Sequence, residues 1–377
     1  MRIAHINFLP SQGVSNKLES LAMSSKELNL PIEVIIISRE KSGIQTDLKI
    51  QNLNLPTNIL KQKWLLNFKR YSIIQKAIDL SVYDRIIIRY PGAMDFSFYR
   101  FFRQNSGKII TEYHSDPIAE LKVIKVGILN PMRIAFERYN SPKLLNKTIG
   151  FISVTEELRQ KYERMSSRKI PSVVVSNGVD VVRTSFTRSA AFKGDELNMI
   201  FVSSRFYPWH GLDRLLDGLQ KYEGRIPINL FLIGRLTYAV DQDRIKSFHN
   251  PRVKIIKTGF LSGDDLDSYF RKSHLAVSSL AIFRNNMSQA CVLKTREYAA
   301  RGIPFIYAYD DVDLSGKEEF ALKLSCDDTP VNVNDILSFA FQVSKMKHIS
   351  EEMRRFAELK LDWKKKIMDM YRFVTKL

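Results

Sequence analysis

Three side chains at the ends of predicted strands are of the types that bind anions or transfer protons. Arg205 and His210 lie in SSRFYPWHG, where a strand ends and a helix begins near Gly211. In open α/β sheets ligands bind beyond the carboxyl ends of the strands, and a guanidinium suits a phosphate there. His114 follows another strand in IITEYHSD. Two alternatives stay open: Arg205 can pair with an acid at the rim, and His114 can be a structural hydrogen-bonding group.

A further charged group lies in QACVLKTREYAARGIPFIY, residues 289–307. Lys294, Arg296 and Glu297 stand together on a predicted helix directly before a predicted buried strand. Such charges can serve solubility alone or can bind a charged ligand. The sequence around them therefore has to be read before a role is assigned.

The composition describes a protein with ample material for hydrophobic cores. The chain has 377 residues, of which 45% are hydrophobic, and this length favours two domains. The two cysteines, Cys291 and Cys326, exclude a disulfide framework, and a reduced, cytoplasmic setting fits them. The N-terminus MRIAHINFLP is predicted to be a first strand and not a signal peptide, and no apolar run is long enough for a membrane span.

The formal net charge of +18 favours polyanionic partners. Between residues 60 and 78, basic residues alternate with aromatic ones on a predicted helix, which is typical of contact with an anionic membrane surface. A core helix with a basic solvent face is the alternative. Nucleic acid is an unlikely partner, because the sequence has no recognition-helix or RNA-binding signature. The residues assigned to the membrane and acceptor surface are Lys61, Lys63, Trp64, Lys69 and Arg70.

Short β-branched runs alternate with helical periodicity along the whole chain, which predicts an α/β fold with parallel sheets. We expect two doubly wound, Rossmann-like domains facing a cleft. The expected divisions are an N-terminal Rossmann-like domain at 1–178, a linker at 179–197, a C-terminal Rossmann-like domain at 198–358 and a helix at 359–377 that packs back on the first domain. The predicted strands cover 2–8, 32–38, 84–90, 107–113, 148–154 and 171–177 in the first domain, and 198–204, 228–234, 252–259, 275–280, 303–309 and 321–326 in the second.

Motifs for several other chemistries are absent from the sequence. No Gly-x-Gly-x-x-Gly follows the first strand, no Walker A pattern occurs, and no histidines pair at metal-ligand spacing. Paired aspartates that could hold a divalent cation occur three times, but helix capping or solvation explains them more simply, and no metal site is predicted. These pairs are Asp241/Asp243, Asp265/Asp267 and Asp311/Asp313.

The order and spacing of several short segments resemble a known family, the retaining glycosyltransferases of family 4, which have the GT-B fold. The resemblance covers most of the chain and depends on the combination of segments, since each one alone is loose. The segments are RIIIRYPG, IITEYHSD, ISVTEEL, VVSNGVD, SSRFYPWHGLDRLL, LFLIGR, KTGFLSGDDLDSYFRKSHLAVSSL and LKTREYAARGIPFI.

The resemblance implies a role for each matching residue around a nucleotide diphosphate sugar. Glu297 resembles the second acid of the family's Glu-x7-Glu motif, which holds the ribose hydroxyls. Arg205 resembles the diphosphate-binding arginine. His210 stands where many members have lysine, and Lys294, one helical turn before Glu297, is expected to supply that contact.

Two residues of the first domain also match the family. Gly13 resembles the glycine that lets backbone amides approach the donor phosphates. His114 resembles the histidine near the donor sugar. One position departs: the first acid of Glu-x7-Glu falls at residue 289, which is Gln289. A glutamine still donates and accepts hydrogen bonds, but it has no charge, so sugar preference or rate can differ.

The sequence thus predicts a hexosyltransferase that retains anomeric configuration and needs neither a metal nor another cofactor. Its donor is expected to be a UDP- or GDP-sugar. Its acceptor is expected to be a lipid-linked saccharide or polysaccharide at the inner face of the cell membrane, in cell-surface glycan synthesis. The alternatives are a non-catalytic GT-B-like interaction protein, a sugar-nucleotide epimerase on the same fold and a basic nucleic-acid binder.

Overall fold

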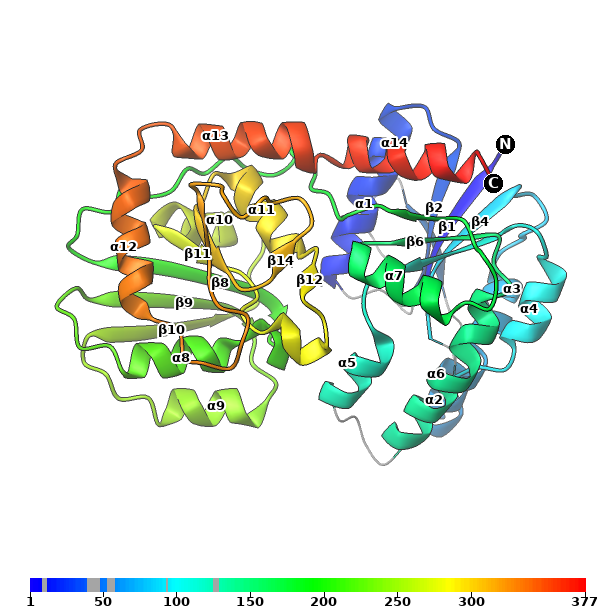
Figure 1. Cartoon of the computed structure of the whole chain (residues 1–377), viewed down its shortest axis with the longest axis horizontal. Helices are drawn as coiled ribbons and strands as arrows, with labels where there is room; N and C mark the ends of the chain where they lie inside the picture. Colours follow the sequence, from blue (N-terminus) through cyan, green and yellow to red (C-terminus); the bar gives the residue numbers. More distant parts are fainter. Residues whose placement is uncertain (9–11, 39–47, 53–57, 93, 125–128) are drawn as a thin grey trace. The chain divides into compact units, whose positions relative to one another are not determined.

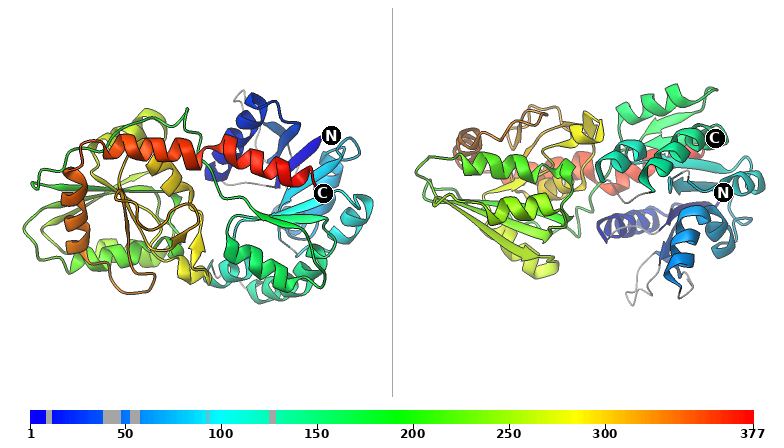
Figure 2. Two further views of the ribbon diagram at one scale, coloured as in Figure 1. Left: turned by 45° about the horizontal axis from the view of Figure 1, so that its top comes forward. Right: turned by 90° about the horizontal axis from the view of Figure 1, so that it is seen from below.

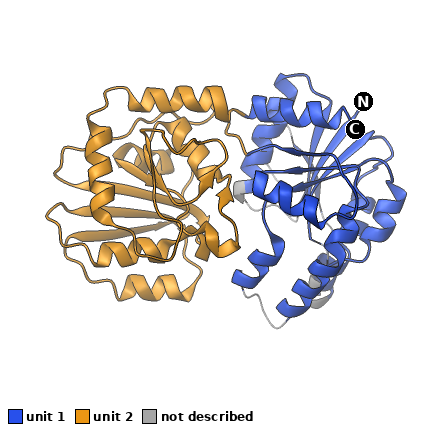
Figure 3. Ribbon diagram, viewed as in Figure 1, with its two compact units in different colours: residues 1–176, 363–377 blue, residues 177–362 orange. Residues whose placement is uncertain are grey.

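The computed structural model describes the chain except for residues 9–11, 39–47, 53–57, 93 and 125–128 (Figure 1). It divides into two compact units (Figure 3). Unit 1 comprises residues 1–176 together with 363–377, and unit 2 comprises residues 177–362. Among the described residues no helix is both long and apolar enough to cross a membrane.

Unit 1 is built on a seven-stranded sheet in the order β3-β2-β1-β4-β5-β6-β7, in which every neighbouring pair is parallel. Its strands are β1 (Ile3–Phe8), β2 (Ile32–Ser38), β3 (Lys49–Asn52), β4 (Arg85–Arg89), β5 (Ile109–Tyr113), β6 (Gly150–Ser153) and β7 (Ser172–Val174). Its helices are α1 (Gln12–Glu27), α2 (Ile59–Phe68), α3 (Arg70–Ala77), α4 (Phe98–Gln104), α5 (Pro117–Ile124), α6 (Asn130–Leu145), α7 (Glu156–Met165) and α14 (Trp363–Val374).

The isoleucine-rich strands of unit 1 supply both faces of its sheet. Successive side chains of a strand point to opposite faces, so Ile86 and Ile88 of β4 enter one core while Ile87 enters the other. Helices α3 and α4 contribute to the first core, whereas α1 and α14 contribute to the second. Figures 1 and 2 show α14, in red, beside the dark blue α1. A parallel sheet covered in this way needs apolar residues at nearly every strand position, as this sequence has.

Unit 2 has a six-stranded parallel sheet in the order β10-β9-β8-β11-β13-β15 and a two-stranded sheet of β12 and β14. The strands are β8 (Leu197–Arg205), β9 (Ile228–Arg235), β10 (Val253–Gly259), β11 (Leu275–Val277), β12 (Gln289–Ala290), β13 (Phe305–Tyr307), β14 (Asp310–Asp311) and β15 (Ala321–Lys323). The helices are α8 (Leu212–Gln220), α9 (Ala239–Lys246), α10 (Gly263–Lys272), α11 (Leu293–Arg301), α12 (Val333–Ser344) and α13 (Ile349–Phe356), with short η1 (Pro208–His210), η2 (Ile282–Asn285) and η3 (Ala357–Leu361).

The divisions between units differ in position from the expected domain boundaries. Residues 179–197, expected to be a linker, belong to unit 2, where Phe192 enters the core and the amide of Ala190 donates to the carbonyl of Ser273. The terminal segment expected at 359–377 divides at residue 362. Its first residues form η3 in unit 2, and α14 packs against α1 of unit 1.

Strands β8 and β9 approach so closely near their carboxyl ends that one position of β9 requires glycine. Gly234 has φ +130°, a value that side chains disfavour, and a Cβ atom there would lie 1.5 Å from the carbonyl oxygen of Ser203. This contact holds the carboxyl ends of β8 and β9 together. It therefore fixes the edge from which Arg205 and His210 extend.

Candidate functional site

At the carboxyl ends of the central strands of unit 1, His114 belongs to a buried hydrogen-bonded group around Glu112. One oxygen of the Glu112 carboxylate lies 3.0 Å from Nε2 of His5, and the other lies 3.1 Å from Nε2 of His114. The amide nitrogen of Asn7 lies 3.1 Å from Nδ1 of His5, and the Lys17 ammonium, from α1, lies 3.5 Å from Nδ1 of His114. The strands β1 and β5 and the helix α1 thus bring these residues together.

The donors around the two imidazoles determine where their protons lie. Asn7 and Lys17 can only donate through these nitrogens, so Nδ1 of each imidazole accepts. Each Nε2 then carries the hydrogen: that of His5 donates to Glu112, whereas that of His114 lies near the other Glu112 oxygen but makes no aligned hydrogen bond with the described residues. Burial, with the nearby charge of Arg89, lowers the pKa of His114 to about 3. Burial by itself would raise the pKa of Glu112, but His114, His5 and Lys17 outweigh it and hold that pKa well below its usual range. The group therefore contains a carboxylate and a neutral His114 near pH 7.

A cavity of about 340 Å³ adjoins this group at the ends of β4 and β5. His114 and Glu112 line it together with Arg89, the last residue of β4. Arg70, which was predicted at the membrane and acceptor surface, lines it as well and is partly buried. Its Nε donates to the carbonyl of Leu66 at 2.5 Å, and its terminal nitrogen donates to the carbonyl of Pro91.

The rest of the predicted basic surface lies on or beside α2. Lys61 and Trp64 are exposed, Trp64 to 51%, and the Lys69 ammonium lies 5.7 Å from the Trp64 ring centre. The surroundings of the Lys63 side chain lie outside the described part of the structure. The assignment of these residues to a membrane and acceptor surface therefore stays a prediction.

In unit 2, Arg205 ends β8 at the carboxyl edge of the sheet and is exposed. Its guanidinium lies 6.0 Å from the ring centre of Tyr207 and makes no side-chain hydrogen bond or ion pair with the residues that the structure describes. The alternative that Arg205 is held by an acid at the rim therefore has no support in the described residues. An unpaired guanidinium at this edge is free to meet an anion.

His210, the last residue of η1, is buried close to Arg205. Its Nδ1 accepts from the amide of Tyr207 at 3.1 Å and lies 3.3 Å from the Ser203 hydroxyl, so Nε2 carries the hydrogen. Burial and the charge of Lys294 hold the pKa of His210 well below its usual range. His210 is consequently a neutral hydrogen-bond donor and not the second cation of the edge.

Lys294 and Glu297 stand one turn apart on α11. The ammonium of Lys294 is buried without a hydrogen-bond partner, 5.0 Å from the Phe201 ring centre, and burial lowers its pKa to about 7. One oxygen of Glu297 accepts from Nε of Arg301 at 2.9 Å, and Arg301 also pairs with Asp267 at 2.7 Å. The second oxygen of Glu297 makes no described hydrogen bond. Helix α11 therefore offers an acceptor and a cation on one side.

Two further predicted residues, Gln289 and Gly13, lie at the beginning of a strand and of a helix. Gln289 begins the short strand β12, which pairs with β14 in the register Gln289 to Asp310. It lies eight residues before Glu297 and on a different element, so it is placed by the small sheet and not by α11. Gly13 lies in the first turn of α1, next to residues outside the described part.

The paired aspartates have structural partners where contacts are described. Asp311 and Asp313 both bind the guanidinium of Arg296, and Asp267 binds Arg301. Within the described ranges, no three side chains of His, Cys, Asp or Glu are grouped as a metal site. Arg89, Lys17 and Glu112 were not predicted as site residues. The sequence signal of Arg89 and Glu112 is a charged residue within an apolar strand, whereas Lys17 is an ordinary lysine on helix α1.

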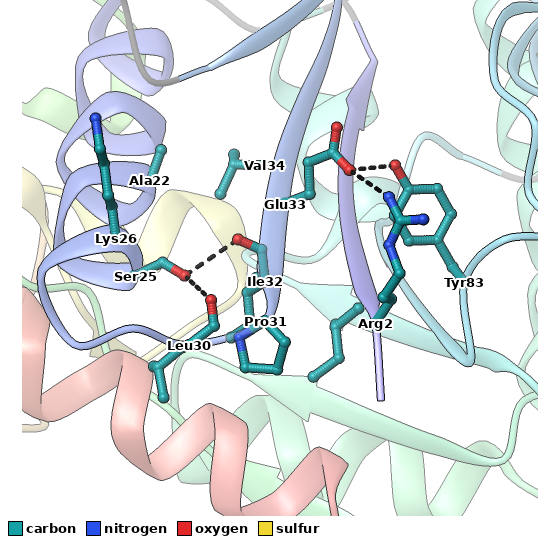
Figure 4. A pocket seen from close by; sticks show the side chains of 11 residues that line it. Arg2, Ala22, Ser25, Lys26, Leu30, Pro31, Ile32, Glu33, Val34 and Tyr83 are labelled. Atoms are coloured by element: carbon teal, nitrogen blue, oxygen red, sulfur yellow. Dashed lines mark hydrogen bonds and ion pairs between the residues drawn. The ribbon is translucent and has the colours of Figure 1, made fainter.

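Another cavity of unit 1, about 380 Å³ in volume, lies among the amino ends of β1 and β2 (Figure 4). There the Glu33 carboxylate accepts from the hydroxyl of Tyr83 and lies 3.7 Å from the Arg2 guanidinium. The Ser25 hydroxyl donates to backbone carbonyls. These polar groups bind one another at the edge opposite His114, so we assign this cavity no chemistry.

The low pKa of His114 predicts how unit 1 responds to acid. Between about pH 6.5 and 3, the unfolded chain binds a proton at this residue and the folded protein does not. The free energy of unfolding should therefore fall as the pH falls through this range, by at most about 1.4 kcal/mol per pH unit for this one proton. Urea titrations of wild type and His114→Asn at several pH values measure the difference.

In that experiment His114→Asn should be less stable near pH 7 but should lose less stability on acidification. The exposed His249 provides a control, since His249→Asn leaves the buried group intact. Equal pH slopes for wild type and His114→Asn would contradict the assignment of a buried neutral imidazole.

No protein-family model matches this chain, and no curated protein matches it. Solved structures do. A sucrose-phosphate synthase from Thermosynechococcus elongatus is 14% identical, with a TM-score of 0.69, over 100% of this chain and 98% of that chain. A glycosyltransferase from Rickettsia africae is 16% identical, with a TM-score of 0.66, over 100% and 98%.

Anabaena Alr3699/HepE, in complex with UDP-glucose, is 15% identical, with a TM-score of 0.65, over 100% of both chains. The identities are low, but each match extends over the whole chain. Together with the two parallel α/β sheets, they show that this chain has the GT-B fold of glycosyltransferases.

Proposed function

We propose that this protein is a retaining glycosyltransferase that transfers a hexose from a UDP- or GDP-sugar. The observation that carries the proposal is the set of unsatisfied groups at the carboxyl edge of unit 2. Arg205 has an unpaired guanidinium, Lys294 an unpartnered ammonium, and Glu297 a carboxylate one turn farther along α11. Two cations and a nearby acceptor match a diphosphate joined to a ribose. The UDP-glucose complex of the similar HepE supports this choice of ligand.

The proposed roles follow from the charge and hydrogen-bonding capacity of each group. Arg205 and Lys294 neutralise the diphosphate, and binding of that anion would favour the charged form of Lys294. His210 donates a neutral hydrogen bond from Nε2. Glu297 accepts from the ribose hydroxyls with the oxygen that Arg301 does not occupy. Since these groups meet the diphosphate charge, we propose that no metal ion or other cofactor is needed.

On the donor sugar, we propose that Gln289 takes the place of the carboxylate that related enzymes are expected to have. Its amide can donate to one hydroxyl and accept from another. His114 of unit 1 is proposed to contact the sugar as a neutral imidazole, because its pKa lies far below 7. Gly13 is proposed to allow the first turn of α1 to approach the phosphates.

Transfer assays with a panel of UDP- and GDP-sugars, in the presence of a membrane extract, test the activity directly. We expect sugar transfer or slow donor hydrolysis that is unchanged by EDTA. Loss of activity in EDTA would refute the metal-free proposal. Nucleotide binding without transfer or hydrolysis would support the alternative of a non-catalytic protein, which Gln289 favours, and conversion of the donor without an acceptor would identify an epimerase.

The ribose assignment predicts that Glu297→Ala weakens binding of UDP or GDP by about 1–3 kcal/mol, the value of a hydrogen bond to a charged group. The fold should survive, because Arg301 keeps its ion pair with Asp267. Isothermal titration calorimetry measures the affinity.

A matched control is Glu358→Ala, which removes another glutamate paired with an arginine four residues away, Arg354, on an exposed helix. We expect that variant to bind nucleotide like wild type. If Glu297→Ala and wild type bind UDP and GDP with equal affinity, the assignment of Glu297 to the ribose hydroxyls is refuted.

We further propose that the acceptor is a lipid-linked saccharide or polysaccharide and that α2 rests on an anionic membrane surface at its cytoplasmic face. The exposed Trp64 beside Lys61 and Lys69 supports this, because an indole and ammonium groups suit the headgroup region. Replacing Lys61 and Lys69 with glutamine should weaken binding by about 1 kcal/mol per lysine.

Co-sedimentation with phosphatidylserine vesicles measures that effect, with phosphatidylcholine vesicles as the uncharged reference. Replacing two exposed lysines of β10 in unit 2, Lys254 and Lys257, gives a variant of the same net charge. If both double variants lose vesicle binding equally, the total charge of the protein accounts for its attraction to the vesicles, and α2 is not the membrane contact.

A further inference from the structure

The cavity beside His114 in unit 1 has an unusual supply of hydrogen-bond donors. It has a volume of about 340 Å³ and lies beyond β4 and β5. Its wall contains Arg89, Arg133 and Tyr113, none of which has a role in the nucleotide site of unit 2. The contacts of these three side chains show what kind of ligand the cavity fits.

Arg89 is a partly buried cation on the wall of this cavity. In the described part of the chain its guanidinium makes neither a hydrogen bond nor an ion pair. Burial lowers its pKa, while Glu112 and Glu120 act on it only through space and oppose that shift. Guanidinium groups removed from water are normally held by acceptors, since an unsatisfied buried charge is costly.

The carboxylates of the same cavity are already engaged. Both oxygens of Glu112 face imidazole nitrogens of His5 and His114. Glu137 accepts from the hydroxyl of Tyr90. Burial raises the pKa of Glu120, which favours its uncharged form. None of these groups therefore neutralises Arg89 by direct contact.

Two more donors of the cavity wall lack partners. Nε of Arg133 and the hydroxyl of Tyr113 are both buried without a hydrogen bond. A terminal nitrogen of the Arg133 guanidinium donates to the side-chain oxygen of Asn67 at 3.1 Å, and this bond holds the Arg133 side chain in place. Tyr113 is likewise held, because its ring stacks on that of Tyr162 at 3.6 Å. Buried donors in proteins almost always have acceptors, so these two unsatisfied donors beside the Arg89 guanidinium indicate an absent acceptor.

We propose that this cavity binds an oxyanion, a phosphate or carboxylate, carried by the substrate that receives the sugar. Arg89 would bind it with two parallel N–H bonds, and Arg133 and Tyr113 would complete the contact. A neutral sugar would leave the Arg89 charge uncompensated. The proposal relies on the proposed function only in calling this ligand the acceptor; the oxyanion site itself stands on the contacts of unit 1.

A second basic region of unit 1 serves as a contrast. Arg100, Arg103, Lys147 and Arg168 line an open hollow at the opposite edge of the sheet. They lie near the carboxyl ends of α4, α6 and α7, where cations balance the helix dipoles. Helix dipoles explain these charges without a ligand, so the hollow provides a control for nonspecific attraction.

Three amphiphiles with the same alkyl chain test the proposal on the full-length protein: octyl phosphate, octyl glucuronide and octyl glucoside, each below its micelle concentration. Calorimetry should show that at least one anionic probe binds about tenfold or more tightly than the neutral glucoside. The tighter anion identifies the group as phosphate or carboxylate. Equal affinity for all three probes would overturn the proposal, and this comparison needs no variant.

Variants then locate the binding. Arg89→Gln should weaken the anionic probe about tenfold or more, and Arg89→Lys should bind with intermediate affinity, because it keeps the charge but not the planar fork. Arg103→Gln, an exposed residue of the opposite hollow, should bind like wild type. Unchanged binding in Arg89→Gln, or loss in Arg103→Gln instead, would refute the site.

UDP titration of the same samples separates this inference from the proposed function. If wild type binds the anionic probe but no nucleotide, the site in unit 1 stands and the transferase proposal falls. If it binds UDP but distinguishes no probe, the nucleotide site proposed for unit 2 stands and the oxyanion site falls.

Discussion

A buried guanidinium, that of Arg296, holds together the part of unit 2 on which the nucleotide residues stand. It is 1% exposed, binds Asp311 and Asp313, and donates to the carbonyl of Asn177 at 3.3 Å. Removing one partner of such a buried ion pair typically costs about 3–5 kcal/mol, since the remaining charge is left unpaired. Helix α11 is thereby fixed against β14 and against the start of unit 2, and Lys294 and Glu297 are positioned by it.

The regular elements were accessible from the sequence, because parallel strands buried on both faces are continuous apolar runs. All twelve predicted strands correspond to observed ones, for example 32–38 to β2 and 228–234 to β9. The strands that were not predicted, β3, β12 and β14, are short and polar. They form because neighbouring segments supply hydrogen bonds, and a local pattern does not contain that information.

The candidate site was less predictable, because its residues obtain their properties from distant neighbours. The segment 60–78 has the pattern of one amphipathic helix, but the structure breaks it at Lys69, whose φ is −136°. The break separates α2 from α3 and turns Arg70 toward the carbonyl of Pro91. Glu112 was hidden inside an apolar strand, and only its contacts with His5 and His114 reveal it.

Both units treat the histidine at their carboxyl edge in the same way. His114 and His210 are buried, accept at Nδ1, and have lowered pKa values. At each edge the imidazole is therefore neutral, while the formal positive charge is on arginine and lysine side chains.

The position of α14 has a consequence for the order in which the protein acquires its structure. Trp363, Ile367, Met370 and Val374 are buried in the same core as Ile3, Leu18 and Ile110, although some 250 or more residues separate them along the chain. During translation, unit 1 is the first to leave the ribosome but lacks one wall of its core until residues 363–374 follow. Unit 2 consists of one contiguous segment of sequence. It can therefore complete its fold before α14, the last helix of unit 1, has been synthesised.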